Sequence, residues 1–169
     1  LIEMLNQTFP NPKAREELAS IGTWNEVSQG KEFDFDGYHV MAVTANHPER
    51  TTPFVYAIRK DGKSILYAHD TAVLSEESFE LLKKFGHFDL VSFDCNGGVL
   101  DTKWATHHMT LLNALDFFEV LERNGNVDDK TIKVASHISH NSDTLHYQLE
   151  EGVKKYGIIA AYDGLEIEF

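Results

Sequence analysis

The first half of the chain contains short runs of alternating or continuous hydrophobic residues, separated by Asp-Gly pairs at 36–37 and 61–62. An Asp-Gly pair between such runs is typical of a two-residue hairpin turn. This half is therefore expected to form two antiparallel strand pairs. The predicted strands cover 33–35, 40–44, 54–58 and 64–67.

The second half combines helical periodicity with apolar strands. Ser75 precedes two glutamates and can cap a helix, and apolar residues recur at helical spacing from Leu111 to Leu121, before an Asn-Gly stop at 124–125. Asp143 is expected to cap a further helix that places Leu145, Leu149 and Val153 on one face. The other predicted elements are a helix over 11–21, strands over 88–93 and 131–136, and a closing hairpin of 158–162 with 165–169.

This order of elements, strand pairs followed by helices that alternate with strands, predicts a layered α/β fold with a mixed sheet. No repeat, low-complexity tract or Pro/Gly/Ser-rich linker interrupts the 169 residues, so no internal domain boundary is placed.

The composition of the chain excludes several classes of function. The net charge of −12 argues against binding of nucleic acid through a broad basic surface. No apolar run approaches the roughly 18 residues of a membrane helix, and no secretory signal pattern is present. Cys95 is the one cysteine, which excludes an internal disulfide framework and a cysteine-based zinc site. These features predict a soluble, cytoplasmic protein.

Several of the nine histidines follow predicted strands, where the side chains of one sheet edge converge. His47 follows one strand, the pair 69–70 another, Asp94 a third and His137 a fourth. One histidine after one strand is more often structural than functional, but three or four such positions favour a metal site, because imidazole and carboxylate bind Zn, Mn and Fe.

The remaining histidines are interpreted more conservatively. His39, His87 and His146 are expected to be structural or solvent-exposed, and His69 is set aside because it should point away from the side that Asp70 faces. Only one of His137 and His140, three residues apart on a predicted loop, needs to contact a metal.

Five stretches together resemble the later part of the metallo-β-lactamase superfamily, and most closely the branch that contains the phosphoribosyl cyclic phosphate phosphodiesterase. The resemblance runs from about Phe33 to Phe169 and implies a four-layer αββα sandwich. The stretches are ILYAHDT (65–71), SFDC (92–95), HMT (108–110), ASHISHNSD (135–143) and YDGLEIEF (162–169).

The resemblance also implies roles for five residues. His47 is similar to the histidine that completes the first metal's ligands, Asp70 to the aspartate that bridges two metals, and His137 to the histidine that binds the second metal. His108 is similar to the histidine that assists phosphoester cleavage, and His140 is expected to contact the substrate phosphate. Two divalent ions (Zn, Mn or Fe) would be the cofactors.

One departure from the family pattern is large: the His-x-His-x-Asp-His loop that supplies the other ligands is absent, and the chain begins at Leu1 without Met. Residues 1–169 are therefore expected to be the C-terminal portion of one such domain, incomplete at the N-terminus. This portion alone should bind metal weakly and be inactive, since each metal would have two protein ligands. It should also expose an apolar face, which a homodimer or the missing N-terminal segment would cover.

The resulting expectation is a metal-dependent hydrolase that cleaves a small or cyclic phosphodiester through a metal-bridging hydroxide. Three alternatives stay open: a metal-free binding or assembly module of the same fold, a tRNA-processing-type endonuclease, and an unrelated α/β domain with coincidental histidines. In the last case His47, Asp70 and His137 should lie far apart.

Overall fold

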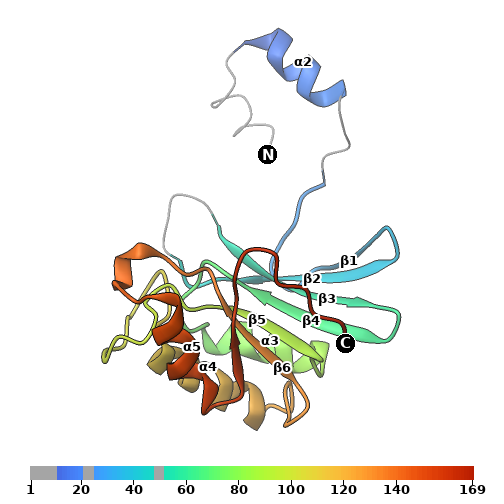
Figure 1. Ribbon diagram of the computed structural model, residues 1–169. Helices are drawn as coiled ribbons and strands as arrows, with labels where there is room; N and C mark the ends of the chain where they lie inside the picture. Colours follow the sequence, from blue (N-terminus) through green and yellow to red (C-terminus); the bar gives the residue numbers. More distant parts are fainter. Residues whose placement is uncertain (1–10, 21–24, 48–51) are drawn as a thin grey trace.

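The computed structural model describes residues 11–20, 25–47 and 52–169. Its centre is a seven-stranded sheet in the order β1 to β7, antiparallel from β1 to β4 and parallel from β4 to β7 (Figure 1). The strands are β1 (Glu32–Phe35), β2 (Tyr38–Thr44), β3 (Phe54–Lys60), β4 (Lys63–Ala68), β5 (Leu90–Asp94), β6 (Ile132–Ser136) and β7 (Ile158–Ala160). The helices are α2 (Pro12–Ser20), α3 (Glu76–Phe85), α4 (Leu111–Arg123), the 3-10 helix η1 (His140–Ser142) and α5 (His146–Lys154). The predicted mixed α/β class is confirmed.

Both Asp-Gly turns form as predicted. Asp36 and Gly37 have φ of 49° and 77°, and Asp61 and Gly62 have φ of 50° and 80°. Two successive left-handed residues match the right-handed twist of the flanking strands, and this conformation favours Asp or Asn followed by Gly. The turns join β1 to β2 and β3 to β4.

The predicted Ser75 cap of α3 forms, and α4 has a cap of the same kind at Thr110. The Ser75 hydroxyl accepts a hydrogen bond from the Ser78 N–H at 3.2 Å, and the Thr110 hydroxyl accepts one from the Asn113 N–H at 3.4 Å. The glutamates in the first turn of α3 and the lysines in its last turn also oppose the helix dipole favourably.

Helices α3, α4 and α5 cover one face of the sheet (Figure 1). Along β3 and β4, the buried side chains stand at every second position and point to this face, as the alternation of a strand requires. Apolar side chains of the helices pack against these buried residues. Fully buried members of this core include Val43, Leu66, Val91, Phe93, Leu82, Phe117 and Leu121. The sheet and these helices form one hydrophobic core that holds the strand ends in place.

The opposite face of the sheet is apolar and only partly covered. Tyr56 pairs with Tyr67 and Ile58 with Ile65 across β3 and β4, so the four side chains share this face. Tyr67 is 47% exposed and the other three are half-buried. The C-terminal segment after β7 returns across the sheet and places the Phe169 ring 5.9 Å from Lys63 Nζ (Figure 1). Among the described residues, one sheet and one helical layer are present, two of the four layers that the resemblance implies.

Two local predictions are wrong. Asp143 does not cap α5, because η1 occupies the residues just before it and α5 begins only after Leu145. Leu145 is also 58% exposed and does not share the buried face of Leu149 and Val153. The closing hairpin does not form either: β7 pairs in parallel with β6, and 165–169 is not a strand. The helix before β7 makes a crossover connection that places β7 parallel to β6, and the residues after β7 run back across the sheet instead of beside β7.

None of the described helices is long and apolar enough to cross a membrane.

Candidate metal and catalytic site

The candidate site lies at one edge of the sheet, where four strands end. Strands β4, β5 and β6 are parallel, and β2 runs in the same direction because two antiparallel pairings separate it from β4. Their carboxyl ends therefore meet at one edge. His47, Asp70, Asp94 and His137 follow or end these strands, as the sequence predicts.

Asp70 lies at the centre of a group of imidazoles. Its Oδ1 is 3.3 Å from His47 Nε2, 3.4 Å from His137 Nε2 and 3.7 Å from His108 Nδ1. The His108 ring stacks on the His137 ring at 5.3 Å between centroids and meets the His47 ring edge-on at 5.2 Å. The structure thus brings the three predicted metal ligands and the predicted catalytic histidine together, which argues against coincidence.

The ligand atoms that lie within 4.8 Å of one another, close enough for one cation, belong to Asp70, Asp94, His108 and His137. His47 is not in this group, and its Nε2 approaches it through Asp70 Oδ1. Donor atoms that bind one tetrahedral zinc at about 2.1 Å lie about 3.4 Å from each other. The separations of the Asp70 oxygen from the His47 and His137 nitrogens match this value. A set of imidazole and carboxylate donors fits Zn, Mn or Fe, so the residues present fit a divalent metal.

The backbone at the site adopts a rare conformation. Asp70, His107 and His137 have φ of 58°, 73° and 56°, in the left-handed region that side-chain-bearing residues seldom enter. Such residues cost free energy and persist where surrounding contacts hold them. Three of the six non-glycine residues with positive φ among the described residues lie at this edge of the sheet.

Asp94 is fully buried beneath the cluster and accepts four hydrogen bonds. Its Oδ1 accepts from the Asn96 and Met109 N–H groups at 2.9 and 3.1 Å, and its Oδ2 from the Thr71 N–H and His108 Nδ1 at 3.2 and 2.8 Å. Because a carboxylate only accepts, Nδ1 of His108 carries the proton of this bond. Asp94 belongs to the group of atoms close enough to hold a metal, but its oxygens are already occupied by donors. It is better suited to orient His108 than to bind a cation.

The sequence identifies Asp94 as a residue that ends a strand, but it indicates no metal-binding or catalytic role for it. A buried acidic residue that ends an apolar strand was the available signal. What the sequence could not show is which donors surround the carboxylate.

Two more histidines lie next to the cluster. The His107 ring meets the His47 ring edge-on at 4.9 Å, and His107 Nδ1 lies 2.8 Å from the Thr106 hydroxyl. His69 Nε2 lies 2.7 Å from the Ser92 hydroxyl. Burial lowers the pKa of His69 to about 4, so this imidazole is neutral at pH 7.

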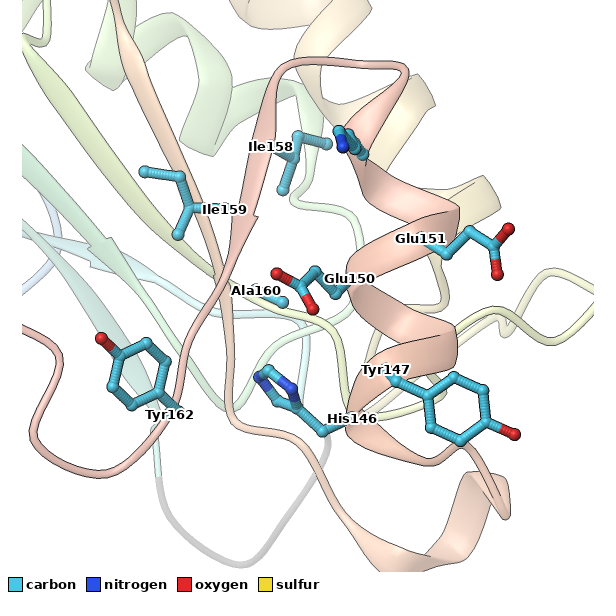
Figure 2. Close-up of a pocket in the computed structure, with 9 residues that line it drawn as sticks. His146, Tyr147, Glu150, Glu151, Ile158, Ile159, Ala160 and Tyr162 are labelled. Atoms are coloured by element: carbon cyan, nitrogen blue, oxygen red, sulfur yellow. The ribbon is translucent and has the colours of Figure 1, made fainter.

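The other predicted residues lie elsewhere. His140, the expected substrate contact, is exposed in η1 and does not belong to the group of closely spaced ligand atoms. His39 bonds to Asp34 and Glu32 within the first hairpin. His146 lines a groove of about 520 Å³ between α5 and β7, where Figure 2 shows it beside Glu150 and Tyr162.

Cys95 is not a candidate nucleophile. Its side chain is fully buried, and burial raises the pKa of its thiol to about 12. The chemistry at this edge of the sheet therefore depends on imidazole and carboxylate groups.

Comparisons with known proteins agree with the fold described above. A family model described as beta-lactamase superfamily domain matches residues 1–138. No curated protein matches the sequence.

Three solved structures illustrate the similarity of fold. The metallo-beta-lactamase fold protein YhfI from Bacillus subtilis is 14% identical, with 89% of this chain and 60% of that chain covered and a TM-score of 0.60. A diphosphatase from the PhnP family is 22% identical over 99% of this chain and 55% of that chain, with a TM-score of 0.64. The isothiocyanate hydrolase from Delia radicum gut bacteria is 20% identical over 94% of this chain and 65% of that chain, with a TM-score of 0.61. The chain thus spans less than two thirds of the length of each of these proteins.

Proposed function

Because this chain belongs to the β-lactamase superfamily domain family, we propose that it carries part of a metal-dependent hydrolase site that cleaves phosphodiester bonds in a small or cyclic phosphate ester. The observation that carries the proposal is the position of Asp70 Oδ1 within 3.4 Å of nitrogens of both His47 and His137. In this proposal these three residues are metal ligands.

Two bound divalent cations would supply Lewis acidity, which activates water and neutralises charge on the phosphate. Asp70 is suited to contact both ions, because its side chain is 61% exposed and its second carboxylate oxygen can turn to another cation. Three ligands divided between two cations leave each ion short of the three or four protein groups that such sites use, so we propose that further donors complete the site.

His108 is proposed as the general acid. Its Nδ1 donates to Asp94, so the proton that leaves during catalysis must come from Nε2. In this role Nε2 gives its proton to the departing alkoxide oxygen, while Nδ1 stays bonded to Asp94, which fixes the orientation of the ring. His140 is proposed to contact the substrate phosphate from η1.

A small anionic substrate fits the charge of the protein. With a net charge of −12, the surface repels a long polyanion, whereas bound cations create a local positive field for one phosphate group. The family supports the metal-dependent hydrolase class, and the ester specificity is the narrower part of the proposal. A cytoplasmic location, suggested by one buried and unreactive thiol, belongs to the proposal as well.

The test measures metal binding by the chain and by Asp70→Asn, and hydrolysis by the intact protein. Zn²⁺ and Mn²⁺ affinities are determined by calorimetry, and bis(4-nitrophenyl) phosphate and a 2′,3′-cyclic nucleotide serve as substrates. Asp70→Asn should weaken Zn²⁺ binding by at least about tenfold. His39→Gln, a change at a histidine in the remote hairpin, should leave it unchanged. Equal Zn²⁺ affinity in the chain and Asp70→Asn would refute the ligand assignment. Hydrolysis is assayed with the intact protein, where metal binding without hydrolysis of any phosphodiester would favour a non-catalytic module.

A further inference from the structure

Asn46, the residue before His47, is bonded to two other loops of the site. Its N–H donates to the Thr71 hydroxyl at 2.9 Å, and its carbonyl accepts from the Ala72 N–H at 3.0 Å and the His107 N–H at 3.2 Å. The backbone of Asn46 therefore joins the loop after β2 to the loop after β4 and to the loop before α4.

The side chain of Asn46 repeats the connection. Its Nδ2 donates to the Val73 carbonyl at 2.8 Å and to the Ala105 carbonyl at 3.5 Å. Val73 lies three residues after Asp70, and Ala105 lies three residues before His108. A single carboxamide thus spans the two loops that carry the central carboxylate and the proposed general acid.

The backbone bonds of Asn46 are made at or next to residues with left-handed backbone conformation. His107 has φ of 73°, and the Asn46 carbonyl holds its N–H directly. Asp70 has φ of 58° one residue before Thr71, whose hydroxyl accepts from Asn46. Left-handed residues with side chains are maintained by surrounding contacts. A side-chain variant of Asn46 keeps these backbone bonds and loses only the bonds of the carboxamide to Val73 and Ala105, so the two loops should shift relative to each other without coming apart.

Asp94 supports the same loops from below, through Thr71 and Met109, but it does not reach Val73 or Ala105. We propose that Asn46 is a positioning residue whose carboxamide sets the spacing between Asp70 and His108. The inference rests on the proposed function for its meaning in catalysis, whereas the spacing itself is a property of the chain without metal.

The chain offers a matched control in Asn126. Its Nδ2 also donates to two backbone carbonyls, those of Leu82 and Gly86, both at 2.7 Å. Asn126 lies before β6, near the start of β5, where its carbonyl accepts from the Phe88 N–H. This is the edge of the sheet opposite the site. Loss of this clamp should cost stability without moving the histidines of the site.

The experiment compares Asn46→Ala with Asn126→Ala by NMR of the imidazole groups in the metal-free chain, together with melting temperature and Zn²⁺ affinity. Both variants should melt at lower temperature. Only Asn46→Ala should shift the ring signals of His107 and His108, and it should weaken Zn²⁺ binding by about tenfold, the scale of losing a residue that orients metal ligands. Asn46→Ser, which keeps one short donor, should give smaller changes of the same kind and serves if Asn46→Ala does not fold.

Unchanged histidine signals in both Asn46 variants, or equal shifts in Asn126→Ala, would overturn the proposal. The NMR result does not depend on metal or substrate. If Asp70→Asn leaves Zn²⁺ binding intact while the Asn46 variants still shift His107 and His108, the proposed function fails and the positioning role stands.

Discussion

Replacing Asp94 with asparagine tests whether the buried carboxylate holds the site together. The change keeps the shape of the side chain but replaces one acceptor oxygen with an NH2 group. Four donors point at the carboxylate, two at each oxygen. With its NH2 group at the Oδ1 position, the amide faces two backbone N–H donors. At the Oδ2 position it faces one, the Thr71 N–H, because His108 can carry its proton on Nε2 and accept at Nδ1.

The loss can be estimated from the number of donors left without an acceptor. Each buried donor without an acceptor costs about 1–3 kcal/mol, so one or two such donors predict a loss of about 1–6 kcal/mol in the free energy of unfolding. Small domains are stable by about 5–15 kcal/mol, so this single change should remove a large part of the total. Asp94 is 0% exposed, so water is not available to replace the lost acceptor.

Urea denaturation followed by circular dichroism measures the effect. Asp89→Asn is the control, because Asp89 also accepts a backbone N–H, from Ser64 at 2.8 Å, and an ion pair from Lys63, but its side chain is 30% exposed. The control should lose about 1 kcal/mol or less. A loss below 1 kcal/mol in Asp94→Asn, or equal losses in the two variants, would show that Asp94 is not the anchor described above.

Three further predictions concern the catalytic histidine, the pH dependence of stability and the open face of the sheet. In the intact protein, His108→Ala should lower turnover by about 10²–10⁴-fold and leave metal content unchanged, as measured by kinetics and elemental analysis; parallel loss of metal would make His108 a ligand. The pKa of His69 is lowered by burial to about 4 in the folded chain, so protonation favours the unfolded state and stability should rise from pH 4 to about 6.5, by about 1–2 kcal/mol after solvent screening. His69→Gln should flatten this rise in urea titrations, and an unchanged slope would contradict the assignment. The apolar face of Tyr56, Ile58, Ile65 and Tyr67 predicts self-association, and Ile58→Lys should shift sedimentation toward the monomer, whereas a wild-type chain that stays monomeric at high concentration would contradict it.

The site was predictable to the extent that strand ends are predictable. His47, Asp70 and His137 each follow an apolar run, and the parallel direction of β4, β5 and β6 brings two of the three strand ends together. Sequence alone placed His108 only through a resemblance, because the residues before α4 follow no strand. Their position depends on a hydrogen bond from His107 to Asn46 and one from His108 to Asp94, which are 61 and 14 residues away in the chain.

The wrong prediction of a closing hairpin also comes from contacts between segments that are far apart in the chain. The terminal stretch YDGLEIEF has the alternation of a strand, and in isolation it fits a hairpin with the preceding run. In the structure β7 pairs in parallel with β6 after the helical crossover, and the terminal stretch runs back across the sheet to place Phe169 near Lys63 of β4. Local alternation therefore identified a strand-compatible segment without identifying its partner.

Turns, helix caps and the alternation of buried residues followed from the amino-acid sequence alone, because they depend on contacts within a few residues. Asp-Gly turns, the Ser75 cap and the buried face of α4 are of this kind. The same local pattern named His47, Asp70 and His137 as residues that end strands. The distances of 3.3 and 3.4 Å between their polar atoms depend instead on the order and direction of strands far apart in the chain. The four donors around Asp94 and the carboxamide of Asn46 also come from separate loops, so their chemistry exists only once the sheet has formed.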